Sequence, residues 1–175
     1  SNVMIYDQIF CDIGDDQSIE SNLSTFSSHM QNITKIIDSV TPNSLVLFDE
    51  IGSGTDPIEG SNLAKSILKY LIEHNVSFIT TTHYSQLKAF AFDEPKIVNA
   101  SMEFDQNTLS PTYHLLLGVS GSSNAFNIAK KLGLKEEIIK NAKKITITSD
   151  DDIRKLIFKL EKQSKEVEAR NIELK

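Results

Sequence analysis

The sequence of 175 residues contains no tryptophan and one cysteine, and its acidic residues outnumber its basic ones. The single cysteine, Cys11, has no partner for an internal disulfide or a zinc site, so we expect a reducing, cytoplasmic setting. The 18 Lys and Arg residues face 24 Asp and Glu residues, which excludes a basic nucleic-acid footprint over the chain as a whole. No apolar run approaches the roughly 18–20 residues of a membrane span, so we expect no membrane partner.

What the sequence does contain is the composition of a globular domain. Hydrophobic residues make up 39% of the chain and charged residues 24%, which allows a buried core. The length fits one ordinary domain with an appendage. Ser1 and Asn2 resemble the residues that remain after protease removal of a tag, and we exclude them from the prediction of the fold.

Strand and helix patterns alternate in the first half of the chain. Apolar runs predict strands at 9–13, 44–48 and 76–81. Helices are expected at about 25–39, after Pro57 and after the third strand. The apolar stripes of the first two helices are predicted at Phe26, Met30, Ile33 and Ile37, and at Leu63, Ile67, Tyr70 and Leu71. This order predicts an α/β fold with parallel strands and right-handed crossovers.

The pattern changes after Pro95. Residues 97–104 and 112–117 predict an antiparallel hairpin, and 125–132 and 135–144 predict two short helices. A final charged helix is expected from Asp150. Its seam has heptad spacing, which fits either a coiled coil or a single solvated helix, and consists of Ile153, Ile157, Leu160, Ser164, Val167, Asn171 and Leu174.

Two adjacent carboxylates, Asp49 and Glu50, directly follow the apolar strand 44–48. Ligands bind at the carboxyl ends of strands in open α/β sheets. In nucleotide hydrolysis, Asp49 would hold Mg²⁺ through its water shell, and Glu50 would orient and deprotonate the attacking water. Taken alone, the pair is equally typical of a solvated strand end.

His83 ends the next predicted strand, 33 residues after Glu50, and a glycine-containing turn at 52–57 lies between them. A lone histidine is more often a packed or surface residue than a catalytic one. At the end of a neighbouring parallel strand, however, His83 would point at the same crevice and could stabilise charge on a γ-phosphate. The context therefore favours a functional His83.

These motifs together resemble the ATPase site of the ABC superfamily, and more closely that of the MutS family of mismatch-repair ATPases. Residues 45–50 resemble its Walker B strand, 52–56 its D-loop and 81–84 its H-loop. Residues 23–30 resemble its signature loop and helix. Their sequence Ser-Thr-Phe-Ser-Ser-His-Met is similar to that of the second bacterial branch, the MutS-two proteins. A transporter motor, the alternative ABC-type ATPase, would carry a Gly-Gly-Gln loop there instead.

The resemblance implies a fold, a domain organisation and a set of ligands. The fold is part of a P-loop NTPase sheet of the ABC-ATPase type with an antiparallel hairpin, followed by a helix-turn-helix and a long charged helix. The implied domains are the C-terminal part of the ATPase domain at 3–118, a dimerisation segment at 119–148 and the start of a helical linker at 149–175. The implied cofactors are ATP and Mg²⁺. Besides the catalytic Glu50 and His83, the residues implied to contact them are Asp49, Ser24, Thr25, Ser53, Gly54, Thr55 and Asp56.

A phosphate-cradling Walker A loop is not found in the sequence, because none of the seven glycines is followed by lysine. In the family, this loop lies N-terminal to the present first residue. We therefore expect that the chain starts inside the ATPase domain, and that by itself it binds nucleotide weakly and is inactive.

The implied partners are a second copy of the chain and nucleic acid. The resemblance implies a homodimer through the ATPase and helix-turn-helix regions, a clamp on branched or recombination DNA, suppression of homologous recombination, a separate endonuclease domain and, in some members, ribosome binding. A helix-turn-helix at 123–144 could instead read DNA with its six lysines. Apolar Phe126, Ile128 and Leu132 favour dimerisation. A non-enzymatic dimerisation module is the remaining alternative.

Overall fold

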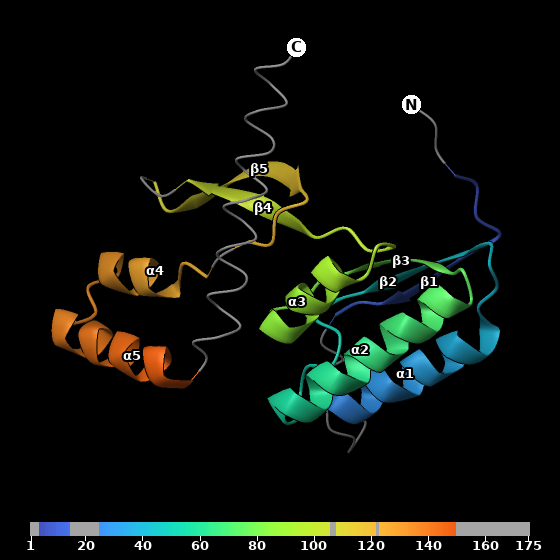
Figure 1. Cartoon of the computed structure of the whole chain (residues 1–175), viewed down its shortest axis with the longest axis horizontal. Helices are drawn as coiled ribbons and strands as arrows, with labels where there is room; N and C mark the ends of the chain where they lie inside the picture. The colour runs from blue at the N-terminus through green and yellow to red at the C-terminus, as the bar shows by residue number, and fades with distance from the viewer. Residues whose placement is uncertain (1–3, 15–24, 106–107, 122, 150–175) are drawn as a thin grey trace, which may run out of the picture. The chain divides into compact units, whose positions relative to one another are not determined.

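The structure is a computed structural model that describes residues 4–14, 25–105, 108–121 and 123–149 (Figure 1). The chain divides into two compact units, Ser1–Leu87 and Lys88–Lys175, called here the N-terminal and C-terminal units. Ser24 and the heptad seam from Ile153 lie outside the described residues. The predictions made for them stay predictions.

The N-terminal unit is built on a sheet of three parallel strands. These are β1 (Gln8–Asp12), β2 (Ser44–Phe48) and β3 (Ser77–Thr80), in the order β1-β2-β3. The predicted parallel arrangement is confirmed. The register aligns the strands so that one row contains Phe10, Val46 and Phe78. All three strands therefore end at the same edge of the sheet.

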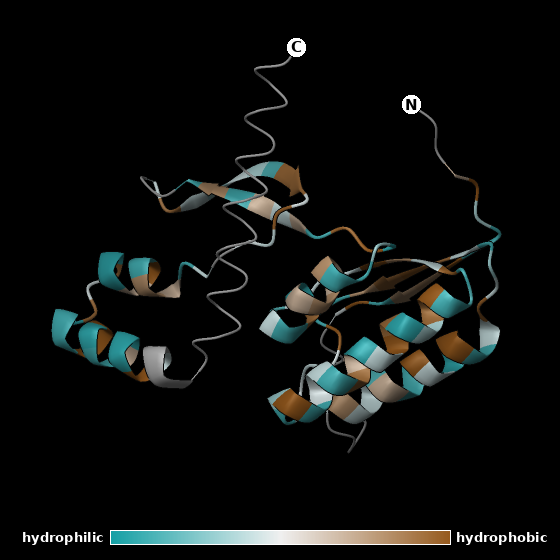
Figure 2. Ribbon diagram, viewed as in Figure 1, coloured by the Kyte–Doolittle hydropathy of each residue, from teal (hydrophilic) through white to brown (hydrophobic). Residues whose placement is uncertain are grey.

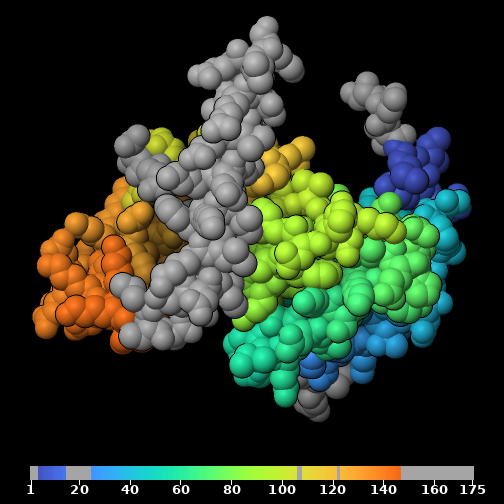
Figure 3. All heavy atoms as spheres, in the orientation of Figure 1, coloured from blue at the N-terminus to red at the C-terminus, as the bar shows by residue number. Residues whose placement is uncertain are grey.

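Helices α1 (Thr25–Ser39) and α2 (Pro57–Glu73) lie along one side of this sheet (Figure 1). In the space-filling view their side chains fill the surface on that side of the unit (Figure 3). Ser44, Val46 and Phe48 are buried, and the residues between them are half-buried. Along β2, buried residues thus alternate with half-buried ones, and no residue of the strand is fully exposed.

The buried faces of the two helices differ from the predicted stripes. In α1 the buried residues are Ile33 and Ile36, whereas Ile37 is half-buried. In α2 the predicted Leu63 and Tyr70 are 40% and 39% exposed. The buried face of α2 consists of Gly60, Ser61, Ala64, Leu68, Leu71 and Ile72. The stripe on α2 is displaced because small residues face the loop after β2, where the backbones approach closely.

Helix α2 is followed by a residue in the left-handed conformation. Asn75 has a φ of +56°, so it adopts the left-handed conformation with which Asn often ends a helix. Helix α3 (Ser85–Asp93) follows β3 and begins in the N-terminal unit. The hydropathy colouring shows the apolar strands of this unit against the mixed surfaces of α1 and α2 (Figure 2).

The C-terminal unit holds the predicted hairpin and helix pair. Strands β4 (Ala100–Asp105) and β5 (Ser110–Leu117) are antiparallel, and α4 (Ala125–Lys131) is followed by α5 (Glu136–Ser149). Helix α5 runs five residues beyond its predicted end. The added residues are mainly β-branched, which costs only a few tenths of a kcal/mol each, and they include no Gly or Pro. None of the described helices is both long and apolar enough to cross a membrane.

Candidate functional site

The carboxyl ends of β2 and β3 bring four polar side chains together. Asp49 and Glu50 follow β2, and Thr81 and His83 follow β3. The hydroxyl of Thr81 donates to Oδ1 of Asp49 at 2.5 Å and accepts the backbone N–H of Glu50 at 2.8 Å. Nδ1 of His83 lies 4.0 Å from Oε1 of Glu50. The predicted Walker B carboxylates and the predicted H-loop histidine are therefore neighbours.

Glu50 and His83 face solvent. Their side chains are 63% and 60% exposed, whereas Asp49 is half-buried. An exposed ion pair at this distance contributes little to stability. The two side chains are therefore held loosely, and Glu50 can reach a water molecule or a ligand at the end of the sheet.

The backbone of Glu50 is unusual. Its φ is +50°, a left-handed conformation that is uncommon outside glycine. Such conformations cost about 1–3 kcal/mol and persist where the surroundings fix them. Here the N–H of Glu50 is bound by Thr81, and its carbonyl oxygen accepts the N–H of Ser53 at 3.0 Å. The turn that follows the two carboxylates is thus fixed from both sides.

The loop after Glu50 is locked against α2 and against the segment after β3. Gly52 has a φ of +81°. A Cβ added at Gly60 would overlap the carbonyl oxygen of Gly52. The same oxygen accepts the buried hydroxyl of Tyr84 at 2.9 Å. The predicted D-loop and the predicted H-loop are therefore joined by a direct hydrogen bond.

The loop also lies beside the first turn of α1. A Cβ added at Gly54 would be 3.2 Å from the backbone nitrogen of Phe26, which follows Thr25. Thr25 is exposed at the start of the helix, and Ser53 and Thr55 are half-buried. The start of α1, where Thr25 lies, and the loop after Glu50 are therefore close together.

Asp56 has a clear structural task. Its Oδ1 accepts the N–H groups of Ile58 at 2.9 Å and Glu59 at 3.0 Å, so it caps the N-terminus of α2. Aspartate is among the preferred residues at this position because it satisfies N–H groups that have no partner inside the helix. The prediction that Asp56 contacts nucleotide is untested by this geometry.

Sequence reasoning missed a second polar cluster, which lies at the carboxyl end of β1. Asp12, at the end of β1, is only 5% exposed. Its Oδ2 lies 2.9 Å from Nδ1 of His29, and its Oδ1 accepts the side-chain amide of Asn32 at 2.9 Å. Both partners are on α1. The cluster fastens the helix that begins at Thr25 to the strand edge, and its only signal in the sequence is the His-x-x-Asn spacing on one helix face.

The carboxylate of Asp49 is suited to a magnesium ion whose other ligands are water and substrate phosphates. Among the described residues, no group of three or more His, Cys, Asp and Glu side chains gathers as a metal cage. Magnesium usually binds proteins through one or two carboxylates and completes its shell with water and substrate phosphates. Asp49, a single carboxylate at the strand edge, suits that mode.

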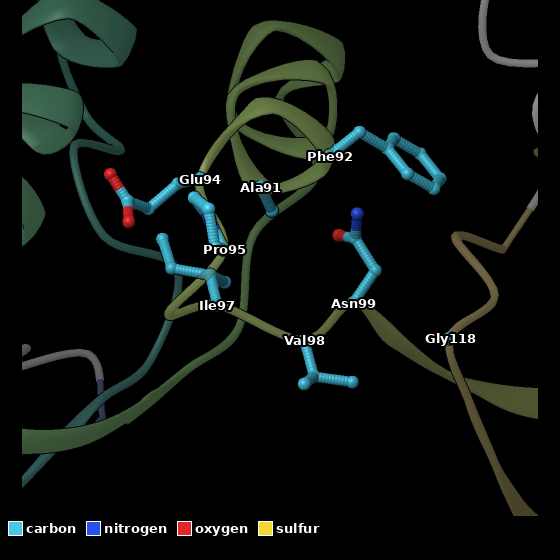
Figure 4. A pocket seen from close by; sticks show the side chains of 8 residues that line it. All are labelled: Ala91, Phe92, Glu94, Pro95, Ile97, Val98, Asn99 and Gly118. Carbon is cyan, nitrogen blue, oxygen red and sulfur yellow. The ribbon is translucent and has the colours of Figure 1, made fainter.

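A small pocket lies in the C-terminal unit, between the end of α3 and the start of the hairpin (Figure 4). Its volume is about 220 Å³, which is below the roughly 300–1,000 Å³ of typical small-molecule sites. It is lined by Ala91, Phe92, Glu94, Pro95, Ile97, Val98, Asn99 and Gly118. None of the predicted site residues lines it.

Comparison with known proteins identifies the family. The family model for MutS domain V matches residues 1–149. The chain is 52% identical over 174 residues to endonuclease MutS2 of Staphylococcus saprophyticus, covering 99% of this chain and 22% of that protein. It is 52% identical over 178 residues to the protein of that name from Finegoldia magna, covering 100% and 23%. It is 53% identical over 175 residues to that from Alkaliphilus metalliredigens, covering 100% and 22%.

The match over most of its residues shows that the chain belongs to the MutS domain V family. The identity to these relatives assigns it to the MutS2 branch, which confirms the resemblance found in the sequence. The chain spans about a fifth of the length of the curated relatives it matches.

Proposed function

We propose that the chain supplies the acidic part of an ATP-hydrolysing site in a MutS2-type ATPase. The observation that carries the proposal is the meeting of Asp49, Glu50 and His83 at the ends of neighbouring parallel strands. Membership of the MutS domain V family supports it. ATP and Mg²⁺ are the proposed ligands.

Each of the three residues has a distinct proposed role. Glu50 orients the attacking water and accepts its proton, which its exposed carboxylate can do without first breaking a strong ion pair. Asp49 holds the water shell of Mg²⁺, and the bound ion neutralises charge on the phosphates. His83 lies on the neighbouring strand, where it can stabilise charge that develops on the γ-phosphate.

In this proposal, the loop that cradles the phosphates comes from another part of the whole protein. The 175 residues contain no glycine followed by lysine, so the Walker A loop would belong to the remainder of the whole protein. The length of the relatives supports this division. The chain alone is expected to bind ATP weakly and to turn it over negligibly.

The proposal is tested by Glu50→Gln in the whole protein that carries this chain. The amide keeps the shape of the side chain but cannot accept a proton, so ATP should still bind while turnover falls by roughly 10²–10⁴-fold. Glu73→Gln, at the exposed end of α2, is the matched control and should leave turnover unchanged. Wild-type turnover in the Glu50→Gln protein would remove Glu50 from its role.

Helices α4 and α5 are proposed to serve dimerisation rather than the reading of DNA. Lys130 and Lys140 both pair with Glu136, at 2.9 and 3.8 Å. The hydrogen bond and charge of Lys130 lower the pKa of Glu136, and the same contact raises the pKa of Lys130. Part of the basic surface is thereby neutralised. Meanwhile Leu132 is 82% exposed, as an interface residue would be in a single copy.

The wider roles of the whole protein remain predictions. The name of the relatives supports an endonuclease activity there. A clamp on branched DNA, suppression of recombination, and binding to ribosomes or ribosomal RNA rest on the family resemblance alone. Each of them concerns residues beyond those of the site described above.

A further inference from the structure

We propose that Thr81 is a positioning residue, whose hydroxyl sets both carboxylates of the site for hydrolysis. The inference rests on the proposed ATPase function. It adds a role for Thr81, to which the H-loop resemblance gave none. It is carried by the hydrogen bonds that Thr81 makes with the segment that follows β2.

Thr81 joins β3 to that segment through four hydrogen bonds. Two are made by its backbone, whose N–H donates to the carbonyl of Phe48 at 3.0 Å and whose carbonyl accepts the N–H of Ile51 at 3.3 Å. The other two are made by the hydroxyl, which donates to Asp49 and accepts from the N–H of Glu50. One residue thus contacts each of four consecutive residues.

The backbone bonds would exist with any side chain at position 81. They continue the β2–β3 pairing by one step, and they do not depend on a hydroxyl. The two hydroxyl bonds end on the carboxylate of Asp49 and the amide of Glu50 and on nothing else among the described residues. The hydroxyl therefore acts on the site and not on the pairing of the strands.

The first effect is on Asp49. The donated hydrogen bond fixes Oδ1, and within the described residues Oδ2 has no hydrogen-bond partner. A carboxylate that accepts a hydroxyl proton on one oxygen keeps lone pairs on the other. Asp49 is therefore held in one orientation with Oδ2 available for a water of the magnesium shell.

The second effect is on Glu50. Its left-handed backbone directs the side chain toward His83, and the bond from its N–H to Thr81 helps to hold that conformation. Without the hydroxyl, this N–H would lose its acceptor and the turn would be free to relax. A shift of the general base by about 1 Å can cost on the order of 10²-fold in rate.

The experiment compares three variants of the whole protein. Thr81→Val removes the hydroxyl while keeping the branched shape, and Thr81→Ser restores a hydroxyl. Thr80→Val is the matched control, since Thr80 precedes it on β3 and its hydroxyl donates only to the carbonyl of Thr81. Amide hydrogen exchange at Glu50 directly reports the hydrogen bond from its N–H to the Thr81 hydroxyl. Turnover and the affinity for a fluorescent ATP analogue, each measured over a range of Mg²⁺ concentrations, report its consequence.

With Thr81→Val we expect faster exchange at Glu50, about a 10- to 100-fold loss of kcat and a higher Mg²⁺ requirement. Nucleotide affinity without Mg²⁺ should be unchanged. Thr81→Ser should restore most of both readouts, and Thr80→Val should resemble wild type. If Thr81→Val does not fold, Thr81→Ala is measured in its place, with the same expectations.

Unchanged exchange, or faster exchange with wild-type kcat and Mg²⁺ requirement, would overturn the inference. Glu50→Gln, measured beside these variants, distinguishes a failure of the role of Thr81 from a failure of the proposed ATPase function. If Glu50→Gln abolishes turnover while Thr81→Val does not, only the role of Thr81 fails. If the wild-type protein does not hydrolyse ATP, or if Glu50→Gln has no effect, the proposed function itself fails.

Discussion

The two units of the chain differ in how far their apolar side chains are buried. Of the thirteen apolar residues that are buried among those described, twelve belong to the N-terminal unit and one, Ile139, to the C-terminal unit. On the hairpin of the C-terminal unit, Met102, Leu115 and Leu117 are 54%, 60% and 67% exposed. The first unit therefore has a core of its own, whereas in the described part of the second unit Ile139 is the one buried apolar residue.

This difference follows from the architecture of each unit. A three-stranded parallel sheet covered by two helices encloses a layer of side chains. A two-stranded ribbon and a pair of short helices enclose little, and such a ribbon is marginally stable by itself. We infer that the C-terminal unit gains its stability from surfaces beyond itself. In the proposed function, those surfaces belong to a second copy of the protein.

The largest effect is expected from Leu71→Ala in the core of the N-terminal unit. Leu71 is fully buried, so its truncation should lower the free energy of unfolding by about 2–5 kcal/mol. The matched variant Leu117→Ala, on the exposed face of β5, should change it by less than about 0.5 kcal/mol. Urea unfolding measures both. Equal losses for the two variants would contradict the contrast between the units.

The meeting of Asp49, Glu50 and His83 was predictable from the sequence because the topology of the sheet places them. Carboxyl ends of neighbouring parallel strands meet at one edge, so Asp49, Glu50 and His83 could be brought together on paper. Thr81 was not singled out, because a hydroxyl at a strand end has no distinctive pattern. Asp12 was missed because its partners on α1 lie 17 and 20 residues away.

The fold was predicted well in its order and less well in its faces. Hydrophobic periodicity located α2, but it ranked Leu63 and Tyr70 above Gly60 and Ala64 as buried residues. Periodicity scores apolar size, whereas the close approach of α2 to the loop at Gly52 selects for small side chains. The sequence signal for such an approach is a small-xxx-small spacing, which hydropathy does not weigh.

The close approach predicts the second largest effect, from Gly60→Ala. In the interior of a helix this change normally stabilises by up to about 1 kcal/mol. Here the added methyl group would overlap the carbonyl oxygen of Gly52, so we expect a loss of about 1–3 kcal/mol instead. Ser66→Ala, on the exposed side of α2, is the control and should be neutral or slightly stabilising. Thermal unfolding of the three proteins decides, and a Gly60→Ala protein more stable than wild type would disprove the close packing.

The smallest effect on stability, and the most informative one about the C-terminal unit, is expected from Leu132→Ser. Leu132 is 82% exposed at the end of α4, so its replacement should change the free energy of unfolding of a single copy by less than about 0.5 kcal/mol. If this surface is buried against a second copy, the loss of a buried leucine costs about 1.5–3 kcal/mol of association. That corresponds to a roughly 10- to 150-fold weaker dimer.

Sedimentation of the whole protein over a range of concentrations measures the association. Leu63→Ser, an exposed apolar position on α2 of the N-terminal unit, serves as the control that should leave the dimer unchanged. A weakened dimer for Leu132→Ser alone would show that the exposed apolar residues of α4 are an interface. The same dissociation constant for both variants and wild type would mean that exposure at α4 has no such purpose, and the dimerisation role of the helix pair would have to be abandoned.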